Sequence, residues 1–459
     1  MKNIQISAYK SNPLFENQTL EDQLDQGHPL IFLAKAIDWE EIEKQCSKFY
    51  HNSHGRVALI TRVMVALLLL KYMFDISDER VVDTWSENVY FQAFTGNGSF
   101  VIGRPCSPSQ MSRFRKRIGE EGCKCIFAES VRIHGRQVLE EHGLIDSTVQ
   151  EKNISYPTDS KLILKVIGTI KRIGSFLKMV FSRSYKIEIK NLKNQINFGR
   201  DSKDNSAKKK AINRLREIAN NLLKSFKEQL PSWSLKLYPI KRALMIWDRA
   251  INQGKKDKNK IYSVHEPQVQ CIAKGKADKK FEFGSKVSFI ISKCSGIILG
   301  ALNFKKNVYD GDTIDPAIKQ LTSLHNGYKP KILIGDRGYR GRPEVRGVKI
   351  VTPYDCKNGL ISSISKKIKR LLGRRVSIEP IIGHLKIDHR LSKNFLKGTL
   401  GDTINPLLSA AAFNFLKYTR IQYSKLHKPP RSLNIYPRQR RKKVTNLPLW
   451  RKDPNSLFY

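Results

Sequence analysis

The sequence is short of acidic residues. Its 459 residues include 41 Asp or Glu against 83 Lys or Arg, which gives a formal net charge of +42 at pH 7. A chain with so much charge of one sign repels itself unless a polyanion neutralises it. Nucleic acid is therefore the expected partner, and an anionic membrane surface is the second choice.

Cysteine is also scarce, and long apolar runs are missing. The seven cysteines are an odd number without a Cys-x-x-Cys pair, so we expect reduced thiols in a cytoplasmic protein, with neither a disulfide framework nor a zinc site. Residues 1–17 are polar and lack the apolar segment of a secretory signal. The longest apolar run, 63–70, is far shorter than the roughly 20 residues that span a bilayer, so no membrane segment is expected.

The first part of the chain, residues 1–140, has helical patterns and predicts an N-terminal helical domain. Ser107 suits the N-cap of its last helix, and Pro108 suits the first helical position. The basic side of this helix either faces solvent only or contacts DNA. The residues that suit phosphate contact are Arg113, Arg115, Lys116 and Arg117.

A second domain is predicted over residues 141–425. Residues from about 161 to 258 are Lys-rich and helix-patterned, which predicts a helical insertion in this domain. The segments that favour strands are 146–150, taken as the first strand of the domain, 268–273, 286–293, 296–304, 331–335 and 348–352. Residues 426–459 are basic and contain several prolines, which predicts a tail that binds phosphates without sequence choice. The pattern alone indicates an α/β fold.

Two aspartates stand where strand-like segments end or approach the edge of a sheet. The run 332–334 is apolar and stops at Gly335 and Asp336, as a buried parallel strand does. Ligands bind at the carboxyl ends of such strands, so we expect Asp336 at the rim of the sheet. Asp146 follows another short apolar approach. An ordinary turn or edge residue is the alternative for each aspartate.

A third carboxylate lies in a helical pattern further along the chain. Glu379 and Lys386 are seven residues apart and therefore share one helical face. Arg375 precedes Glu379 by four residues, but Pro380 predicts that the helix begins near Ser377. A salt-bridged surface face is the alternative.

Together the three carboxylates suit a site with two divalent metal ions. Three carboxylates from separate elements are able to hold two Mg²⁺ ions, and a nearby Lys or Arg is able to hold a DNA phosphate. Rival carboxylates are Asp159, which also suits a helix N-terminus, and Glu266, which follows His265 and is a candidate to line the cleft. Asp310 and Asp312 suit a turn.

The triad Asp146, Asp336 and Glu379, within Asp-Arg-Gly-Tyr and Arg-x3-Glu-x6-Lys motifs, resembles that of IS5-like transposases, a bacterial DDE group related to the IS4 group. One departure is Leu372, where the IS4 signature has a Tyr. Other matching blocks are 146–160, 261–276, 281–286 and 398–414.

The resemblance implies an RNase H-like core, a mixed sheet with helices, in which Asp146, Asp336 and Glu379 bind two Mg²⁺ or Mn²⁺ ions. It implies cleavage at terminal inverted repeats, transfer of the freed 3′-hydroxyl to target DNA, and a homodimer or larger multimer on DNA in a bacterial cytoplasm. Lys386 and Arg375 would contact DNA, and Arg337 would shape the rim with Tyr339. An RNase H-like nuclease without strand transfer and an inactive DNA-binding relic are the alternatives.

Overall fold

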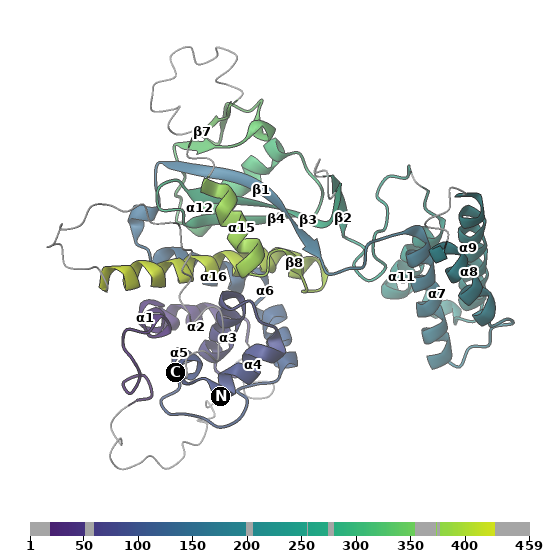
Figure 1. The fold of residues 1–459 in the computed structure, drawn as a ribbon, viewed down its shortest axis with the longest axis horizontal. Coiled ribbons are helices and arrows are strands. Elements are labelled where there is room, and N and C mark those ends of the chain that lie inside the picture. Colours follow the sequence, from purple (N-terminus) through teal and green to yellow (C-terminus); the bar gives the residue numbers. More distant parts are fainter. Residues whose placement is uncertain are drawn as a thin grey trace. The chain divides into compact units, whose positions relative to one another are not determined.

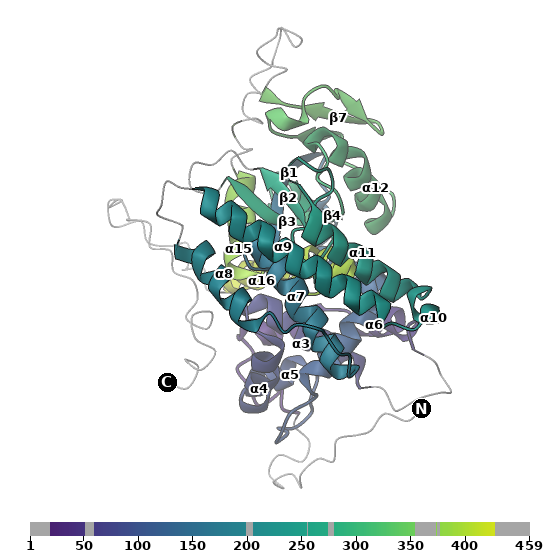
Figure 2. The same ribbon diagram turned by 90° about the vertical axis from the view of Figure 1, so that its right-hand side faces the viewer.

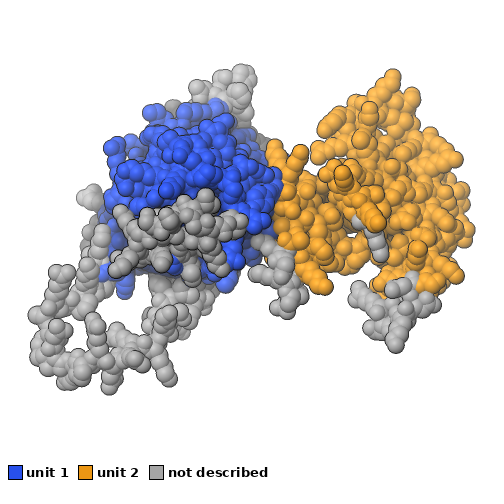
Figure 3. Space-filling model, turned by 90° about the horizontal axis from the view of Figure 1, so that it is seen from above, with its two compact units in different colours: residues 1–150, 286–304, 308–459 blue, residues 151–285, 305–307 orange. Residues whose placement is uncertain are grey.

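The computed structural model describes residues 19–50, 59–198, 205–254, 256–273, 280–353, 373 and 377–426. The chain forms two compact units (Figure 3). Unit 1 comprises residues 1–150, 286–304 and 308–459, and unit 2 comprises residues 151–285 and 305–307. Arg375, Leu372 and the basic tail after residue 426 lie outside the described residues.

Helices fill the N-terminal part of unit 1, as predicted. The Ser77 hydroxyl accepts a hydrogen bond of 3.1 Å from a backbone N–H in the first turn of its helix. Ser107 forms a reciprocal capping box with Gln110, and Pro108 occupies the first turn, so the predicted start of α6 is confirmed. The helices are α1 (Pro29–Ala36), α2 (Trp39–Ser47), α3 (Thr61–Met73), α4 (Asp78–Glu87), α5 (Val89–Phe94) and α6 (Pro108–Arg132).

A mixed sheet forms the second part of the fold, in agreement with the predicted α/β class. Its strand order is β2-β3-β1-β5-β7-β6, with β4 paired to β3 and β8 paired to β1. β1, β5 and β7 are parallel, whereas β3 and β4 are antiparallel. The strands are β1 (His142–Lys152), β2 (Gln270–Ala273), β3 (Phe281–Ser292), β4 (Ile298–Phe304), β5 (Ile332–Ile334), β6 (Glu344–Val345), β7 (Val348–Val351) and β8 (Lys393–Asn394).

The two faces of this sheet bury different helices. Leu144 and Ile334 point to a hydrophobic cluster that includes residues of α15 (Ile378–Asp388) and α16 (Gly398–Leu426). Ile145 and Leu333 point the other way, to a cluster with α12 (Ile314–Leu324). Because side chains alternate along a strand, even-numbered positions of β1 face α15 and α16.

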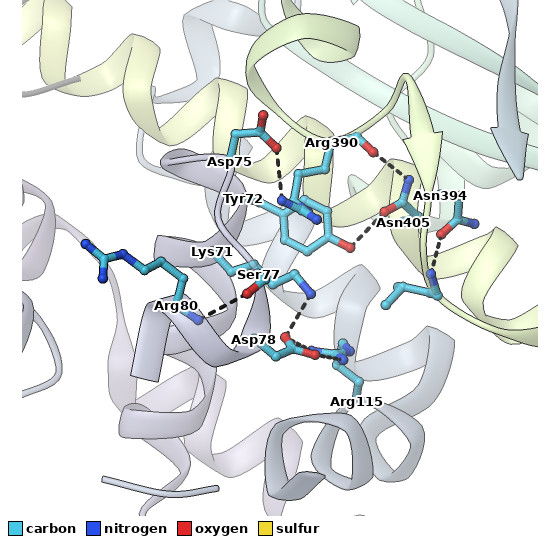
Figure 4. A network of polar contacts seen from close by, with 11 residues as sticks. Lys71, Tyr72, Asp75, Ser77, Asp78, Arg80, Arg115, Arg390, Asn394 and Asn405 are labelled. Atoms are coloured by element: carbon cyan, nitrogen blue, oxygen red, sulfur yellow. Dashed lines mark hydrogen bonds and ion pairs between the residues drawn. The ribbon is translucent and has the colours of Figure 1, made fainter. Parts of the chain in front are cut away.

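Helix α16 lies between the sheet and the N-terminal helices (Figure 1). Polar bonds reinforce this packing (Figure 4): the Tyr72 hydroxyl donates to Asn405 over 2.8 Å, and Arg390 binds Asp75 over 3.0 Å. Asn405 also donates to the carbonyl oxygen of Arg390 over 3.3 Å. The helices of residues 1–140 therefore share a core with the sheet, and their role as a separate DNA-binding domain stays a prediction.

A buried ion pair holds α4 against α6 (Figure 4). Arg115 binds both carboxylate oxygens of Asp78, over 2.7 and 2.5 Å, and Lys71 binds the same carboxylate over 2.8 Å. Burial would raise the pKa of Asp78, but the hydrogen bonds from Arg115 and the charge of Lys71 outweigh it and lower the pKa. Burial, followed by the charge of Arg115, lowers the pKa of Lys71 to about 8.

Unit 2 contains the helices predicted for the insertion (Figure 2). Apolar residues on α9 recur at helical spacing and are buried in the cluster of this unit, among them Leu215, Ile218 and Leu222. The helices are α7 (Asp159–Phe176), α8 (Lys186–Phe198), α9 (Asn205–Glu228), α10 (Ser232–Leu235) and α11 (Tyr238–Asn252). Within the ranges that the structure describes, no helix has the length and apolar content to cross a membrane.

Replacing Asp78 by Asn should lower the free energy of unfolding by about 3 kcal/mol, because the charge of Arg115 then stays buried without its counter-ion. The contribution of the carboxylate is present above its usual pKa of 3.8 and is lost as the pH falls through the lowered value. Chemical denaturation at several pH values measures both effects.

Asp83→Asn is the matched control on the same helix. Asp83 binds Arg104 over 2.7 Å in an exposed pair, so its loss should cost less than about 1 kcal/mol. Equal destabilisation by the two substitutions would contradict the structural role given to Asp78.

Candidate active site

The pairing of β1 with β5 sets two aspartates side by side. The strands are parallel, with Leu144 opposite Ile334. Asp146 follows Leu144 by two residues, and Asp336 follows Ile334 by two residues. The two aspartates therefore occupy equivalent positions on neighbouring segments of the sheet. Period-two alternation directs Asp146 to the face that carries α15 and α16. Both predicted aspartates therefore lie at the same place on the sheet.

Local hydrogen bonds hold both carboxylates. Asp336 caps the short 3₁₀ helix η4 (Arg337–Tyr339), where its Oδ1 accepts a bond of 2.7 Å from the backbone N–H of Gly338. Asp146 Oδ1 accepts a bond of 2.7 Å from the backbone N–H of Ser147. The carboxylates are half-buried, so one side of each stays accessible to solvent.

The third predicted carboxylate, Glu379, lies in the first turn of α15, which begins directly after Ser377 as predicted. Ile378 and Leu385 of this helix are buried in the same hydrophobic cluster as Leu144 and Ile334. The helix is therefore anchored on the face to which Asp146 points. Glu379 is exposed, and Lys386 is half-buried two turns further along.

A fourth carboxylate, Asp310, stands beside the two aspartates. It begins η3 (Asp310–Thr313), and the prediction of a plain turn missed its contacts. Its Oδ1 accepts hydrogen bonds from Ser147 Oγ over 2.5 Å and from Lys286 Nζ over 3.0 Å. Short-range sequence patterns gave no signal for this cluster, because its members are far apart along the chain.

Gly338 fits between two of these carboxylates. A Cβ atom at this position would lie 2.9 Å from Asp336 Oδ1 and 3.0 Å from Asp310 Oδ2. Since real Cβ atoms essentially never come closer than 3.0 Å to another heavy atom, a larger residue would displace the carboxylate of Asp336. The missing side chain thus lets Asp310 and Asp336 approach one another.

Tyr339 is buried next to the carboxylates of the site. It was expected at the rim, but only 1% of its surface is exposed. Among the described residues its hydroxyl has no partner at hydrogen-bonding geometry, although the Thr313 side chain is near enough to act weakly on it. Burial, and then the negative charges of Asp146 and Asp310, raise the pKa of Tyr339 well above its ordinary value. The phenol therefore stays protonated beside the carboxylates.

The donor set partly fits a divalent metal. Mg²⁺ and Mn²⁺ prefer carboxylate oxygens, which Asp146 and Asp336 supply from adjacent strands. Within the described ranges, however, no three His, Cys, Asp or Glu side chains lie close enough to share an ion. The register of β1 and β5 thus brings Asp146 and Asp336 near one another, but the described residues form no three-carboxylate cluster with Glu379.

Two rival carboxylates have structural roles. Asp159 lies in the first turn of α7, after the N-cap Thr158, as its helix-terminus reading predicted. Glu266 is buried and binds the buried Lys152 over 3.2 Å. Both rivals belong to unit 2, whereas Asp146 and Asp336 belong to unit 1.

The basic residues predicted to contact DNA differ in exposure. The prediction that Arg115 contacts DNA is wrong. This side chain is only 4% exposed and its guanidinium binds Asp78, so Arg115 supports the fold. Arg113, Lys116 and Arg117 are exposed on α6, and the guanidinium of Arg117 lies 4.8 Å from the ring centroid of Tyr50. A further exposed cation, Arg337, follows Asp336 directly.

Two family models match the chain. A transposase domain (DUF772) matches residues 18–117, and a transposase DDE domain matches residues 257–415. A Rhizobium meliloti protein, described as uncharacterized protein ORF8 in the nfe locus, is 36% identical over 184 residues, which cover 38% of this chain and 88% of that protein. No solved structure matches.

The match to the DDE domain thus places this mixed sheet in the class of DNA-processing proteins with an RNase H-like core. The chain belongs to the DDE transposase family. Transposases act on DNA, and DDE domains normally use divalent metal ions. This membership supports an enzyme of the transposase or nuclease type.

Gly338→Ala should weaken Mn²⁺ binding at least about tenfold, because the added methyl displaces the carboxylate of Asp336, a proposed ligand, from its observed position. Titration calorimetry of the folded protein measures the affinity. Gly383→Ala in α15 is the control, since a Cβ there meets no atom within 4 Å. Unchanged Mn²⁺ affinity in Gly338→Ala would contradict the arrangement of the carboxylates.

Proposed function

We propose that the chain is the transposase of an IS5-like insertion sequence, which cuts DNA at the terminal inverted repeats of its element and joins the ends to target DNA. The observation that carries the proposal is the register of β1 and β5, which sets Asp146 beside Asp336 within a DDE-family chain.

Asp146, Asp336 and Glu379 are the proposed catalytic triad. When held by these carboxylates, two Mg²⁺ or Mn²⁺ ions would activate the attacking oxygen and stabilise the leaving oxygen. Asp146 and Asp336 would supply oxygen ligands from the sheet. Glu379 would supply the third carboxylate when the first turn of α15 moves towards the two aspartates. Its exposure leaves room for that approach.

The joining step needs no further co-reactant. A freed 3′-hydroxyl oxygen at the element end attacks a phosphorus atom of target DNA, and the bond from that phosphorus to the adjoining 3′-oxygen breaks as the new bond forms. Lys386, two turns from Glu379 on the same helical face, would hold a phosphate next to the site. Arg337 and Arg375 are proposed to contact the DNA at the rim.

Recognition of the element ends is proposed for residues 1–140, the catalytic steps for residues 141–425, and non-specific phosphate binding for the tail, 426–459. The exposed cations Arg113, Lys116 and Arg117 on α6 support the first role. Because two ends must be cut and joined together, we propose a homodimer or larger multimer on DNA.

A cleavage and strand-transfer assay on DNA with the element's own ends tests the proposal. Asp146→Asn, Asp336→Asn and Glu379→Gln keep the shape of each side chain but remove a charged metal ligand, so each should lower both activities at least about a hundredfold. Asp159→Asn is the matched control and should remain active, because that residue lies in the first turn of α7 in unit 2.

Cleavage without joining would favour an RNase H-like nuclease, and tight DNA binding without cleavage by the wild type would favour an inactive relic. Full activity in Glu379→Gln alone would remove Glu379 from the triad while leaving the two aspartates in place.

The basic face of α6 gives a separate prediction. Arg113→Ala and Lys116→Ala should each weaken DNA binding and lower the slope of log affinity against log salt by about 1, because each removes one phosphate contact. Lys124→Ala on the same helix is the control, since Lys124 already binds Glu120 and Glu121. Equal effects of all three substitutions would contradict a specific DNA face on α6.

A further inference from the structure

One end of the helical unit 2 exposes large apolar side chains. Phe176 at the end of α7 is 85% exposed, Trp233 of α10 is 66% exposed, and Tyr238 at the start of α11 is 72% exposed. The described tryptophans other than Trp233, which are Trp39, Trp85 and Trp247, are buried. Exposed aromatic residues in such number indicate an interaction surface.

Hydrogen bonds hold the two aromatic segments side by side. The Gln229 side chain, after α9, accepts a bond of 3.0 Å from the backbone N–H of Val180 and donates one of 2.8 Å to its carbonyl oxygen. Gln229 lies four residues before Trp233, and Val180 lies four residues after Phe176. The loop after α7 and the approach to α10 thus lie side by side.

Buried neighbours direct Trp233 outward. Met179 and Phe181 pack against the hydrophobic cluster of unit 2. Val180, which lies between them in the sequence, is exposed. Leu235 packs against the same cluster, and Ser234 is buried, while Trp233 is exposed. The segments on either side of Trp233 and Val180 are therefore anchored to the core of unit 2.

The charge around this surface is mainly positive. Residues 171–188 and 228–248 together contain eight Lys or Arg and three Asp or Glu, and one of these acids, Glu188, binds Arg183 over 3.3 Å. The exposed cations nearest in sequence to the rings are Lys178, Lys236, Lys241 and Arg242. Two copies of such a surface would repel one another, whereas a polyanion would neutralise it.

We propose that this surface, defined by Phe176, Trp233, Tyr238 and the cations beside them, binds single-stranded DNA. Exposed rings stack on unpaired bases, and nearby cations hold the phosphates, without sequence choice. Duplex DNA hides its bases from such rings. The inference rests on the proposed function for its partner, but the surface contains no residue of the carboxylate site.

The test compares ring-keeping and ring-removing substitutions in the full-length protein. Trp233→Leu and Phe176→Leu keep an apolar side chain but lose the ring, so each should weaken binding of an unpaired oligonucleotide of about 20 nucleotides at least about fivefold. Trp233→Tyr and Phe176→Tyr should retain wild-type affinity. Fluorescence anisotropy measures the affinities, and the matching duplex should bind all variants alike.

Met245→Leu is the control, because Met245 is an exposed apolar residue of α11 without a ring. Wild-type affinity of Trp233→Leu and Phe176→Leu for the unpaired strand would overturn the proposal, as would equal loss in the tyrosine variants. Loss of self-association in sedimentation, with DNA binding unchanged, would assign the surface to a second copy instead. Binding needs no cleavage, so an inactive Asp146→Asn protein that still binds separates this proposal from the proposed function.

Discussion

The parallel pairing of β1 with β5 is the constraint on which the candidate site depends. Leu144 and Ile334 are buried on the same face of the sheet and lie opposite one another, which fixes the register. A slip of one residue would send both apolar side chains to the wrong face. The two aspartates follow at equal distance along each strand, so the packing of the core also aligns the carboxylates.

Helix α16 links this sheet to the N-terminal helices. It lies between the two layers, and one hydrophobic cluster includes residues of α3, α6, β1 and α16. The hydrogen bond from Tyr72 to Asn405 and the ion pair of Arg390 with Asp75 cross the same junction. A change in the N-terminal helices therefore acts on the packing beneath the carboxylates, even though the proposed DNA contacts on α6 are exposed.

Local features of the fold were predictable from the sequence because their causes are local. Ser107 and Pro108 mark the start of α6, and the apolar run before Gly335 marks β5. The α/β class and the helical insertion followed from such patterns, and the RNase H-like core followed from the family resemblance. The first turn of α15 after Ser377 followed from the position of Pro380.

Contacts between distant parts of the chain were not predictable in the same way. Arg115 was taken for a DNA contact because its neighbours are basic, but it lies at helical spacing from the buried Met111 and Ile118, which was an available signal that it points inward. Asp310 gave no such signal, since Ser147 and Lys286 reach it only in the folded chain. The position of Glu379 relative to the aspartates likewise depends on tertiary packing.

The most direct test of the account is an anomalous diffraction map of crystals of the protein with DNA ends and Mn²⁺. The account predicts two peaks about 4 Å apart, with Asp146 and Asp336 as ligands and Glu379 beside one of them. Mn²⁺ held by Asp310 and Asp336 without Asp146, or peaks away from Asp146 and Asp336, would contradict the proposed triad.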